Sequence, residues 1–496
     1  MKLIGIIICW SLILILAGCE NWLDVEPENS ISSEELYSTG EGFRNQLNGA
    51  YKELSSTGLY GRELSWGFLD VLGQYYNSST LSTIYADVSN FSYEVDGVKT
   101  SISSIWKNMF HVVVNCNQAL ENLDTKSESL FELGVVEKDL LKGEFLALRA
   151  FVHFDLLRLF APSPKSGESG VYIPYVKNSE NTVNVPLSVE DVLKNVIDDF
   201  ESARQLVSVY DTTEMEGFPS ENDWKNVSFR LKTNTTSTSL FFMGRGYRMN
   251  YYAITALLAR VHAYQGNMVE AYKYAKEIYD KGYFKFTDFW NITSDINNRN
   301  RKLYDDIIWG LMNQKMAEAY ENTVYSINSS TLALRYPEDI FGGGNTNDYR
   351  YNYLLTGLKT SRVLSVKNFL GSETEMSLIS EQVIPVIRLS ELYYIMGEYL
   401  AGSADQADRD EAVRLLESLR SARGETVKLP GIENSTDILK AYQDLVLEDA
   451  RREFICEGQI FYMYKRLNRP LFDGKLEFDL EDKYYFPIPE GESVLL

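Results

Sequence analysis

Acidic and basic side chains near the C-terminus have a spacing that invites comparison with glycoside-cleaving enzymes. Arg388, Glu391 and Glu398 fall within one expected helix over residues 383–400. Seven helical residues separate the two glutamates by about 10.5 Å, whereas paired glycosidase carboxylates lie roughly 5–5.5 Å apart, or 6.5–9.5 Å with a water between them. The spacing therefore favours an intrahelical ion pair, with a cap or an interhelix bond, over acid–base catalysis. The same interpretation applies to Arg451, Glu453 and Glu457.

Metal and nucleophile chemistry has little support in the sequence. The three histidines, His111, His153 and His262, fall in expected helices without a second ligand four residues away. The acidic run at 479–482 lacks the spacing of a calcium-binding loop. Neither a nucleophile elbow nor a zinc-protease motif is present in the sequence. We therefore predict no catalytic residue, no metal site and no cofactor. The sequence does not decide whether a structural calcium ion is bound.

Aromatic residues in irregular segments are the strongest candidates for ligand contact. The chain has 33 Tyr, 24 Phe and 7 Trp. A tyrosine or tryptophan ring offers an apolar face and a polar edge, which suits the C–H face and hydroxyl rim of a sugar. The alternative is that these rings fill satellite cores beneath long loops. We expect a subset of the following residues to form the site: Trp66, Tyr75, Tyr76, Asn77, Tyr85, Trp290, Trp309, Tyr320 and Tyr349.

The first residues of the chain are typical of a lipoprotein signal peptide. Lys2 precedes an apolar run from Leu3 to Leu16, and small residues follow at 17 and 18. The run is shorter than the roughly 20 residues that span a bilayer. Cys19 then stands where a bacterial lipobox places the lipidated cysteine. We predict a signal peptide over 1–18, a lipid anchor on Cys19 and an acidic tether over 19–40; an ordinary transmembrane anchor is the alternative.

Composition narrows the class of protein. The sequence has 496 residues, 45% of them hydrophobic, and a net charge of −22 from 48 basic and 70 acidic residues. Such an acidic chain is a poor candidate for nucleic-acid binding, because phosphate contacts need Lys and Arg. Apart from Cys9 and Cys19, only Cys116 and Cys456 are present. Both lie in apolar helical stretches and are expected to be small buried side chains, with a disulfide between them left open.

Hydrophobic periodicity predicts a mainly helical protein. The expected helices cover 41–57, 104–124, 137–160, 188–207, 248–264, 268–281, 383–400, 408–423, 437–456 and 459–467. Residues 137–160 are apolar on more than one face, so neighbours must cover this helix on several sides. Ser188, with Asp191 three residues later, is expected to cap the helix at 188–207.

Helix pairs and long insertions alternate along the chain. Ala259, Gly266 and Ala271 in the pair at 248–281 resemble the small-residue pattern of a tetratricopeptide repeat. The pairs 104–124 with 137–160, and 383–400 with 408–423, have similar outlines, and such pairs bury their apolar faces by stacking. We therefore expect one domain over 41–496, with scaffold at 41–57, 104–207, 248–281 and 383–467. The segments 58–103, 208–247 and 282–380 are too long for ordinary connections and are expected to carry function.

Several sequence pieces, in this order, resemble the SusD/RagB family of surface nutrient-binding lipoproteins. They are the lipobox, Trp22-Leu23-Asp24, Leu148-Arg149-Ala150-Phe151, the pair at 248–281, Ile387-Arg388-Leu389-Ser390-Glu391, Arg451-Arg452-Glu453-Phe454 and Phe486-Pro487-Ile488-Pro489. The resemblance implies a tetratricopeptide-like helical scaffold with a loop-rich ligand-binding face. It also implies an outer-membrane, cell-surface location and a SusC-like TonB-dependent β-barrel as partner.

The resemblance further implies that the ligand is an oligosaccharide, or a peptide as in some family members. We therefore predict a non-enzymatic receptor that binds a nutrient and passes it to the barrel. Two alternatives remain at this point. A surface hydrolase would need a convergent cluster of carboxylates or a nucleophile, and a purely structural interaction module would bury its aromatic loops.

Overall fold

The computed structural model describes residues 32–180, 183–231, 240–295, 298–325, 331–343, 346–358, 360–370 and 375–493. The predicted signal peptide, Cys19 and most of the predicted tether lie outside these residues. From Ser33 onward the chain belongs to the folded body, because Tyr37 is fully buried against Phe43. Residues 33–40 are therefore not part of a flexible tether.

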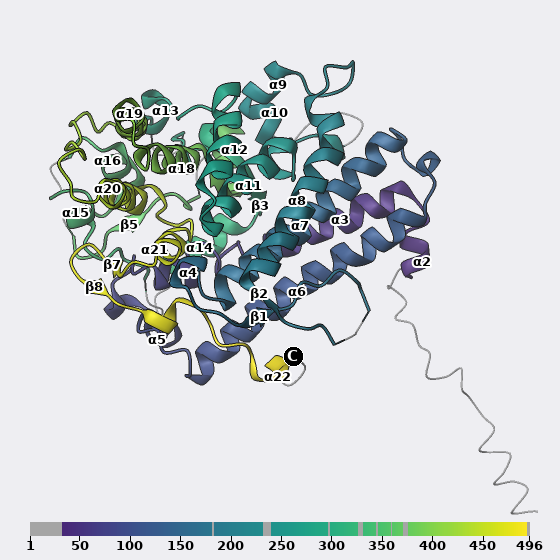
Figure 1. The fold of residues 1–496 in the computed structure, drawn as a ribbon, viewed down its shortest axis with the longest axis horizontal. Helices are drawn as coiled ribbons and strands as arrows, with labels where there is room; N and C mark the ends of the chain where they lie inside the picture. The colour runs from purple at the N-terminus through teal and green to yellow at the C-terminus, as the bar shows by residue number, and fades with distance from the viewer. Residues whose placement is uncertain are drawn as a thin grey trace, which may run out of the picture.

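The protein is mainly helical, as the periodicity predicts (Figure 1). The longer helices are α3 (Gly40–Leu54), α6 (Asp96–Thr125), α7 (Val135–Phe160), α8 (Val189–Thr212), α11 (Tyr251–Gln265), α12 (Met268–Lys281), α18 (Leu389–Ala401), α19 (Gln406–Ala422) and α20 (Ile438–Glu453). The shorter helices are α2 (Ser33–Leu36), α4 (Phe68–Leu72), α5 (Thr83–Ser89), α9 (Glu221–Lys225), α10 (Val227–Leu231), α13 (Phe289–Thr293), α14 (Met316–Val324), α15 (Pro337–Ile340), α16 (Tyr349–Leu354), α17 (Glu375–Gln382), α21 (Ile460–Leu467) and α22 (Glu490–Ser493).

Four two-stranded antiparallel sheets complete the described structure. They pair β1 (Val171–Ile173) with β2 (Leu187–Ser188), β3 (Ile307–Met312) with β6 (Val383–Arg388), β4 (Leu355–Thr356) with β5 (Leu364–Ser365), and β7 (Leu471–Phe472) with β8 (Glu477–Phe478). In the β3–β6 pair, Ile307 lies opposite Arg388 and Met312 lies opposite Val383.

The long helices form a continuous array of antiparallel pairs. α6 packs on α7, α7 on α8, α8 on α11, α11 on α12, α12 on α18, and α18 on α19, and Figure 1 shows α3, α6, α7 and α8 lying side by side at one end. Ala259 and Ala271 are fully buried between α11 and α12. Gly266 closes α11 with a φ of 90°, a left-handed conformation that glycine adopts without strain. The predicted tetratricopeptide-like scaffold is confirmed.

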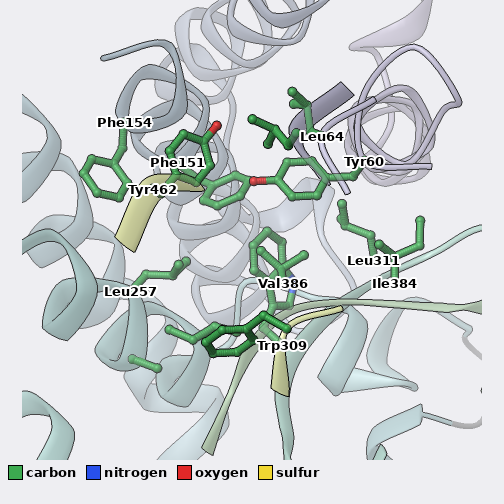
Figure 2. Close-up of a cluster of buried hydrophobic side chains, with 14 of the residues drawn as sticks. Tyr60, Leu64, Phe151, Phe154, Leu257, Trp309, Leu311, Ile384, Val386 and Tyr462 are labelled. Atoms are coloured by element: carbon green, nitrogen blue, oxygen red, sulfur yellow. The ribbon is translucent and has the colours of Figure 1, made fainter. Parts of the chain in front are cut away.

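Local capping and burial explain the two strongest helix predictions. The Ser188 hydroxyl accepts a hydrogen bond from the backbone N–H of Asp191 at 3.1 Å, so the predicted cap of α8 is present. On α7, every residue from Ala147 to Phe160 is buried, and Phe151 and Phe154 are both fully buried. Figure 2 shows these two rings in the same cluster as Trp309 and Tyr462, so α7 is the centre of the hydrophobic core.

Three sequence predictions about secondary structure were wrong. Residues 383–388 form strand β6 rather than helix, because the β-branched run Val-Ile-Pro-Val-Ile pairs with β3 before α18 begins at Leu389. Helix α6 begins at Asp96, eight residues before the predicted start. The segment 58–103, expected to be mostly irregular, contains the short helices α4 and α5, and the segment 208–247, expected to be a loop or a small β excursion, contains α9 and α10.

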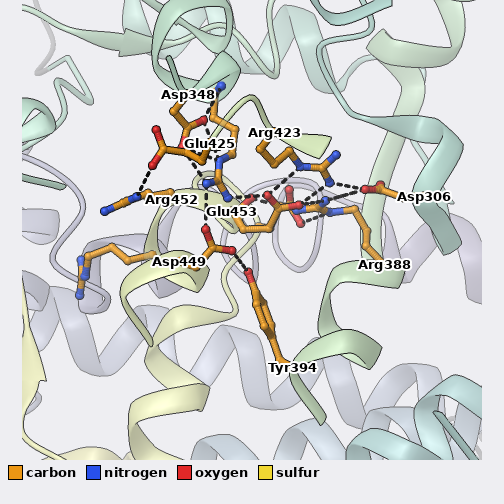
Figure 3. Close-up of polar contacts among 12 residues, drawn as sticks. Asp306, Asp348, Arg388, Tyr394, Arg423, Glu425, Asp449, Arg452 and Glu453 are labelled. Atoms are coloured by element: carbon orange, nitrogen blue, oxygen red, sulfur yellow. Dashed lines mark hydrogen bonds and ion pairs between the residues drawn. The ribbon is translucent and has the colours of Figure 1, made fainter. Parts of the chain in front are cut away.

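A buried cluster of ion pairs joins the second half of the chain. We call it the central ion cluster, and its members are Asp306, Asp348, Arg350, Lys367, Arg388, Arg423, Asp449, Glu453 and Glu457 (Figure 3). Glu453 lies at its centre and accepts hydrogen bonds from Arg388 at 2.5 Å and from Arg423 at 2.7 Å through one oxygen. Its other oxygen accepts from Arg350 at 2.9 Å.

The charges of the central ion cluster compensate one another. Burial alone would raise the pKa of the Glu453 carboxyl, but Arg423 and Arg388 outweigh burial and hold this pKa well below its usual value. Arg388 also donates to Glu457 at 2.8 Å, and Lys367 donates to the other oxygen of Glu457 at 2.7 Å. A carboxylate surrounded in this way stays ionised in the interior, and the cluster therefore ties β6, α16, α19 and α20 together.

The two predicted structural cysteines and the three histidines serve the fold. Cys116 and Cys456 are both buried and unbridged, so the possible disulfide between them does not form. His111 is exposed and contacts Glu53, and His262 stacks on Tyr274. His153 is fully buried; one ring nitrogen contacts the Arg149 carbonyl at 2.8 Å and the other accepts from the Val176 N–H at 3.0 Å.

Removing the charge of Glu453 should destabilise the protein strongly. In Glu453→Gln, Arg388 and Arg423 keep their buried positive charges without the carboxylate between them, so we expect a loss of about 3–5 kcal/mol in the free energy of unfolding. Urea unfolding followed by circular dichroism measures this loss. Glu411→Gln removes a carboxylate from an exposed pair with Arg414 and should change stability by less than about 0.5 kcal/mol. Equal effects of the two substitutions would contradict the assigned role of Glu453.

Acid should destabilise the protein through His153. Burial lowers the pKa of His153 from 6.5 to about 3, so the unfolded chain takes up a proton at a higher pH than the folded chain does. The stability contribution is complete above about pH 6.5 and is lost at about 1.4 kcal/mol per pH unit as the pH falls toward 3. His153→Gln should reduce the stability difference between about pH 7 and pH 5 by roughly 2 kcal/mol in urea unfolding. An unchanged pH dependence would show that His153 does not stay neutral in the folded state.

Candidate ligand-binding site

Five of the nine aromatic and polar residues selected from the sequence lie in the interior. Trp66, Tyr75, Tyr76, Trp309 and Tyr320 are at most 2% exposed. The Tyr75 hydroxyl donates to the Arg451 carbonyl at 2.9 Å and the Tyr76 hydroxyl donates to the Trp66 carbonyl at 2.8 Å. A ligand on the surface has no access to these rings, so the candidate site no longer includes them.

Neighbouring aromatic rings account for this burial. Trp66 packs edge-on against Tyr320 with ring centroids 5.0 Å apart, and Trp309 packs edge-on against Phe151 of α7 at 4.8 Å. The loop segments thus add to the core instead of lying over it, which is the satellite-core alternative considered for these residues. Sequence alone does not separate the two roles, because a ring on a long irregular segment suits both.

Asn77 and Tyr85 lie at the edge of the same segment and are half-buried. Asn77 caps a short 3-10 turn at 78–80 by accepting from the backbone N–H of Ser79. The Tyr85 hydroxyl donates to Glu63 at 2.9 Å. Both side chains already have protein partners.

Trp290 is the exception among the predicted residues, since 78% of it is exposed. It belongs to α13, next to Phe289, and the two ring centroids lie 5.0 Å apart. Phe289 in turn contacts Tyr349 of α16 at 5.0 Å, and Tyr349 lies 6.2 Å from Tyr353. These four rings, Phe289, Trp290, Tyr349 and Tyr353, form a continuous surface that we call the aromatic ledge.

A small core of its own supports the aromatic ledge. Ile292, Leu303 and Leu354 are buried beneath it, and Tyr349 and Tyr353 pack partly against them. Arg299 joins the two helices: it donates to the Tyr353 carbonyl at 2.6 Å and to the Ser294 carbonyl at 3.1 Å, and its guanidinium lies 5.3 Å from the Tyr353 ring centre. The Tyr349 and Tyr353 rings of α16 are therefore held in place by contacts within the protein.

The central ion cluster fixes α16 from the other side. Asp348 and Arg350 are both buried in the cluster and pair with each other at 2.7 Å. Tyr349 stands between them in the sequence, and its side chain therefore points away from the cluster, to the ledge. Its backbone N–H donates to the Arg423 carbonyl at 2.7 Å. The position of the half-buried Tyr349 ring is thus set by buried charges on both sides of it in the sequence.

The ledge combines ring faces with hydrogen-bonding groups at its border. Asn291 follows Trp290 directly and Asn352 precedes Tyr353, and both amides are exposed. Aromatic faces beside amides can stack on the C–H face of a sugar and bond its hydroxyls. Phe289, Tyr353 and Arg299 were not selected from the sequence; the i, i+4 spacing of Tyr349 and Tyr353 and the adjacency of Phe289 to Trp290 are the signals that would have found the two rings.

The carboxylates considered for catalysis are engaged in ion pairs between elements. Glu391 pairs with Arg260 of α11 at 2.6 Å, and Glu398 pairs with Arg466 of α21 at 2.6 Å. Arg388 pairs with Glu453 and Glu457, so the expected pair with Glu391 in the same helix is absent, because Arg388 ends β6 and turns into the central ion cluster. The expectation of interhelix bonds is confirmed for both glutamates.

Comparison with known proteins finds similarity to SusD-like proteins both in a family model and in individual relatives. A family model described as "Starch-binding associating with outer membrane" matches residues 21–218. SusD-like protein P38 of Formosa agariphila is 22% identical over 96% of this chain and 93% of its own length. SusD-like protein P25 of the same organism is 24% identical over 42% of this chain and 39% of its own length.

Solved structures show the same fold. A putative sugar binding protein from Bacteroides vulgatus matches with a TM-score of 0.69 and 21% identity, over 92% of this chain and 96% of that one. A SusD superfamily protein from Bacteroides thetaiotaomicron matches with a TM-score of 0.68 and 18% identity, over 92% and 98%. These likenesses define the class: a mainly helical protein with the tetratricopeptide-like fold of the SusD superfamily. The family model and the curated relatives support a SusD-like family for this chain.

Proposed function

We propose that this protein is an outer-membrane surface lipoprotein that binds an oligosaccharide on the aromatic ledge and delivers it, unmodified, to a SusC-like TonB-dependent β-barrel. The observation that carries the proposal is Trp290, a large apolar ring that is 78% exposed on a rigid support. Exposing such a ring to water is unfavourable unless a partner covers it. The exposed Asn291, next to Trp290 in the sequence, favours a partner with hydroxyls over a purely apolar one.

The relatives support a glycan as the ligand. The matching family model is described as starch-binding and associated with the outer membrane, and one solved neighbour is named a putative sugar binding protein. Within the described residues, none of the helices combines the length and the hydropathy needed to cross a bilayer. We propose attachment through Cys19, on the basis of its lipobox-like sequence, as the means of association with the membrane. A peptide remains the second ligand class to test.

Replacing Trp290 should weaken oligosaccharide binding. A central tryptophan typically contributes about 2 kcal/mol to an interface, so Trp290→Ala should lower affinity by roughly 30-fold. Isothermal titration with maltoheptaose, other neutral oligosaccharides and peptides measures the effect. Tyr279→Ala is the matched control, because Tyr279 is an exposed ring on α12, outside the ledge. The proposal fails if none of these ligands binds, or if the two variants bind equally well.

Removing Cys19 should release the protein from the membrane. We expect Cys19→Ala to leave the outer-membrane fraction of the host, because stable anchoring depends on acyl chains. Fractionation and blotting measure the distribution, and affinity purification of the wild-type protein from solubilised membranes should recover a β-barrel transporter. Cys116→Ala, which removes a buried thiol on α6, should stay in the membrane fraction. Retention of Cys19→Ala in that fraction would argue against lipid anchoring, and recovery of no barrel would argue against the delivery step.

A further inference from the structure

Lys302 is a buried lysine without a charged partner. It lies between α13 and β3 and is 3% exposed, and no carboxylate among the described residues forms an ion pair with it. Two other buried lysines are compensated: Lys367 pairs with Glu457 at 2.7 Å, and Lys465 donates to two backbone carbonyls. A buried ammonium without such compensation is unfavourable.

The unfavourable charge favours the neutral form of the Lys302 side chain. Burial lowers the pKa of Lys302 to about 7, although the charges of Cys456 and Glu457 act in the opposite direction. A large share of the side chain is therefore an uncharged amine at neutral pH. An uncharged lysine amine in an apolar environment is a nucleophile.

The side chain of Asn368 lies directly against this amine. Nζ of Lys302 donates a hydrogen bond to Oδ1 of Asn368, which is 1% exposed. Because Cγ of Asn368 is bonded to Oδ1, the nitrogen lies next to the carbonyl carbon of the amide. The amide nitrogen, Nδ2, is buried and has no hydrogen-bond partner among the described residues. An unsatisfied buried NH₂ group is unfavourable.

A nucleophile, a carbonyl carbon and a leaving group are thus held together in the interior. Contact in the folded chain replaces a bimolecular encounter, which favours reaction between the two side chains. Burial of both side chains also keeps bulk water away from the amide carbon. Lys465 lacks this arrangement, because the carbonyls that it contacts belong to the backbone.

We propose that Lys302 and Asn368 join spontaneously through an intramolecular isopeptide bond. The bond between Nζ and Cγ forms, the bond between Cγ and Nδ2 breaks, and ammonia leaves. One proton passes from Nζ to Nδ2, so the two side chains become one neutral secondary amide. The reaction consumes no oxidant and no other reactant.

Glu457 is the carboxylate that we assign to the proton transfer. Its charge acts on Lys302, and it accepts a hydrogen bond from Lys367, the residue before Asn368. A carboxylate takes the proton from Nζ and returns it to Nδ2, and is unchanged at the end.

The product removes both unfavourable groups at once, the buried amine and the unpartnered NH₂. It also closes a covalent loop over residues 302–368, which includes α16 of the aromatic ledge. Lys302 directly precedes Leu303, part of the small core beneath the ledge. The bond therefore keeps these segments connected even when the chain unfolds. It forms whether or not the ledge binds an oligosaccharide.

Peptide mapping of the purified full-length protein tests the bond. Trypsin cleaves after Lys302 only where its amine is free, so the unlinked chain gives peptides 303–315 and 368–388. We expect instead a branched peptide, in which 302–315 is joined to 368–388 with the loss of one ammonia. Fragmentation in the mass spectrometer should place the junction at Lys302 and Asn368. Full recovery of both linear peptides, without the branched one, would overturn the proposal.

Single variants assign the junction to its two residues. Asn368→Ala and Lys302→Met should each abolish the branched peptide, whereas Asn352→Ala, which removes an exposed amide on α16, should retain it. A branched peptide that persists in Asn368→Ala would contradict the assignment. The mass of the intact protein alone is not sufficient, because Asn48-Gly49 loses one ammonia when it forms a cyclic imide.

Discussion

The ionised carboxylate of Glu453, buried among three guanidinium groups, is the interaction on which the second half of the structure depends. A charge in the interior is tolerated only when partners surround it with good geometry. Arg350, Arg388 and Arg423 come from the start of α16, the end of β6 and the end of α19. Satisfying one carboxylate therefore fixes the relative positions of four elements that are distant in the sequence.

This constraint reaches the surface through α16. Asp348 and Arg350 are held inside, and the residue between them has to present its side chain outward. Because Tyr349 and Tyr353 lie on the same face of a short helix, fixing one end of α16 also fixes Tyr353, and Arg299 then connects that ring to the segment behind α13. A binding surface arranged before the ligand arrives loses less conformational entropy on binding. Under the proposed function, the buried charges therefore contribute to the binding surface as well as to the fold.

The scaffold could be predicted from the sequence, whereas most of the site could not. Apolar periodicity predicts helices such as α7 and α8, and the capping residue Ser188 marks the start of α8. Both signals depend only on residues that are close in the sequence. Trp66 and Tyr320 are buried partly because they pack against each other, although more than 200 residues separate them in the sequence. A local sequence pattern does not contain that information. Trp290 could be selected by type, but its exposure results from the small core of Ile292, Leu303 and Leu354 beneath it, which only the folded chain reveals.

The same limit applied to charged residues. The spacing of Arg388 and Glu391 suggested a pair within one helix, but the backbone changes from strand to helix at Leu389 and turns the two side chains toward different partners. Sequence spacing predicts a contact only where the secondary structure is uniform over that spacing. Glu398 lies within α18, where the secondary structure is helical throughout, and its interhelix role was therefore predicted correctly.

The distribution of charge also bears on the ligand. Among the described residues, more Arg and Lys side chains than Asp and Glu side chains are buried. The chain as a whole carries a net charge of −22, so the solvent-exposed surface holds a larger share of the acidic residues than the composition suggests. Coulomb repulsion then opposes the approach of a polyanionic glycan, while a neutral sugar that stacks on Trp290 meets no such opposition. An uncharged oligosaccharide, the ligand class in the proposed function, is therefore compatible with an acidic surface.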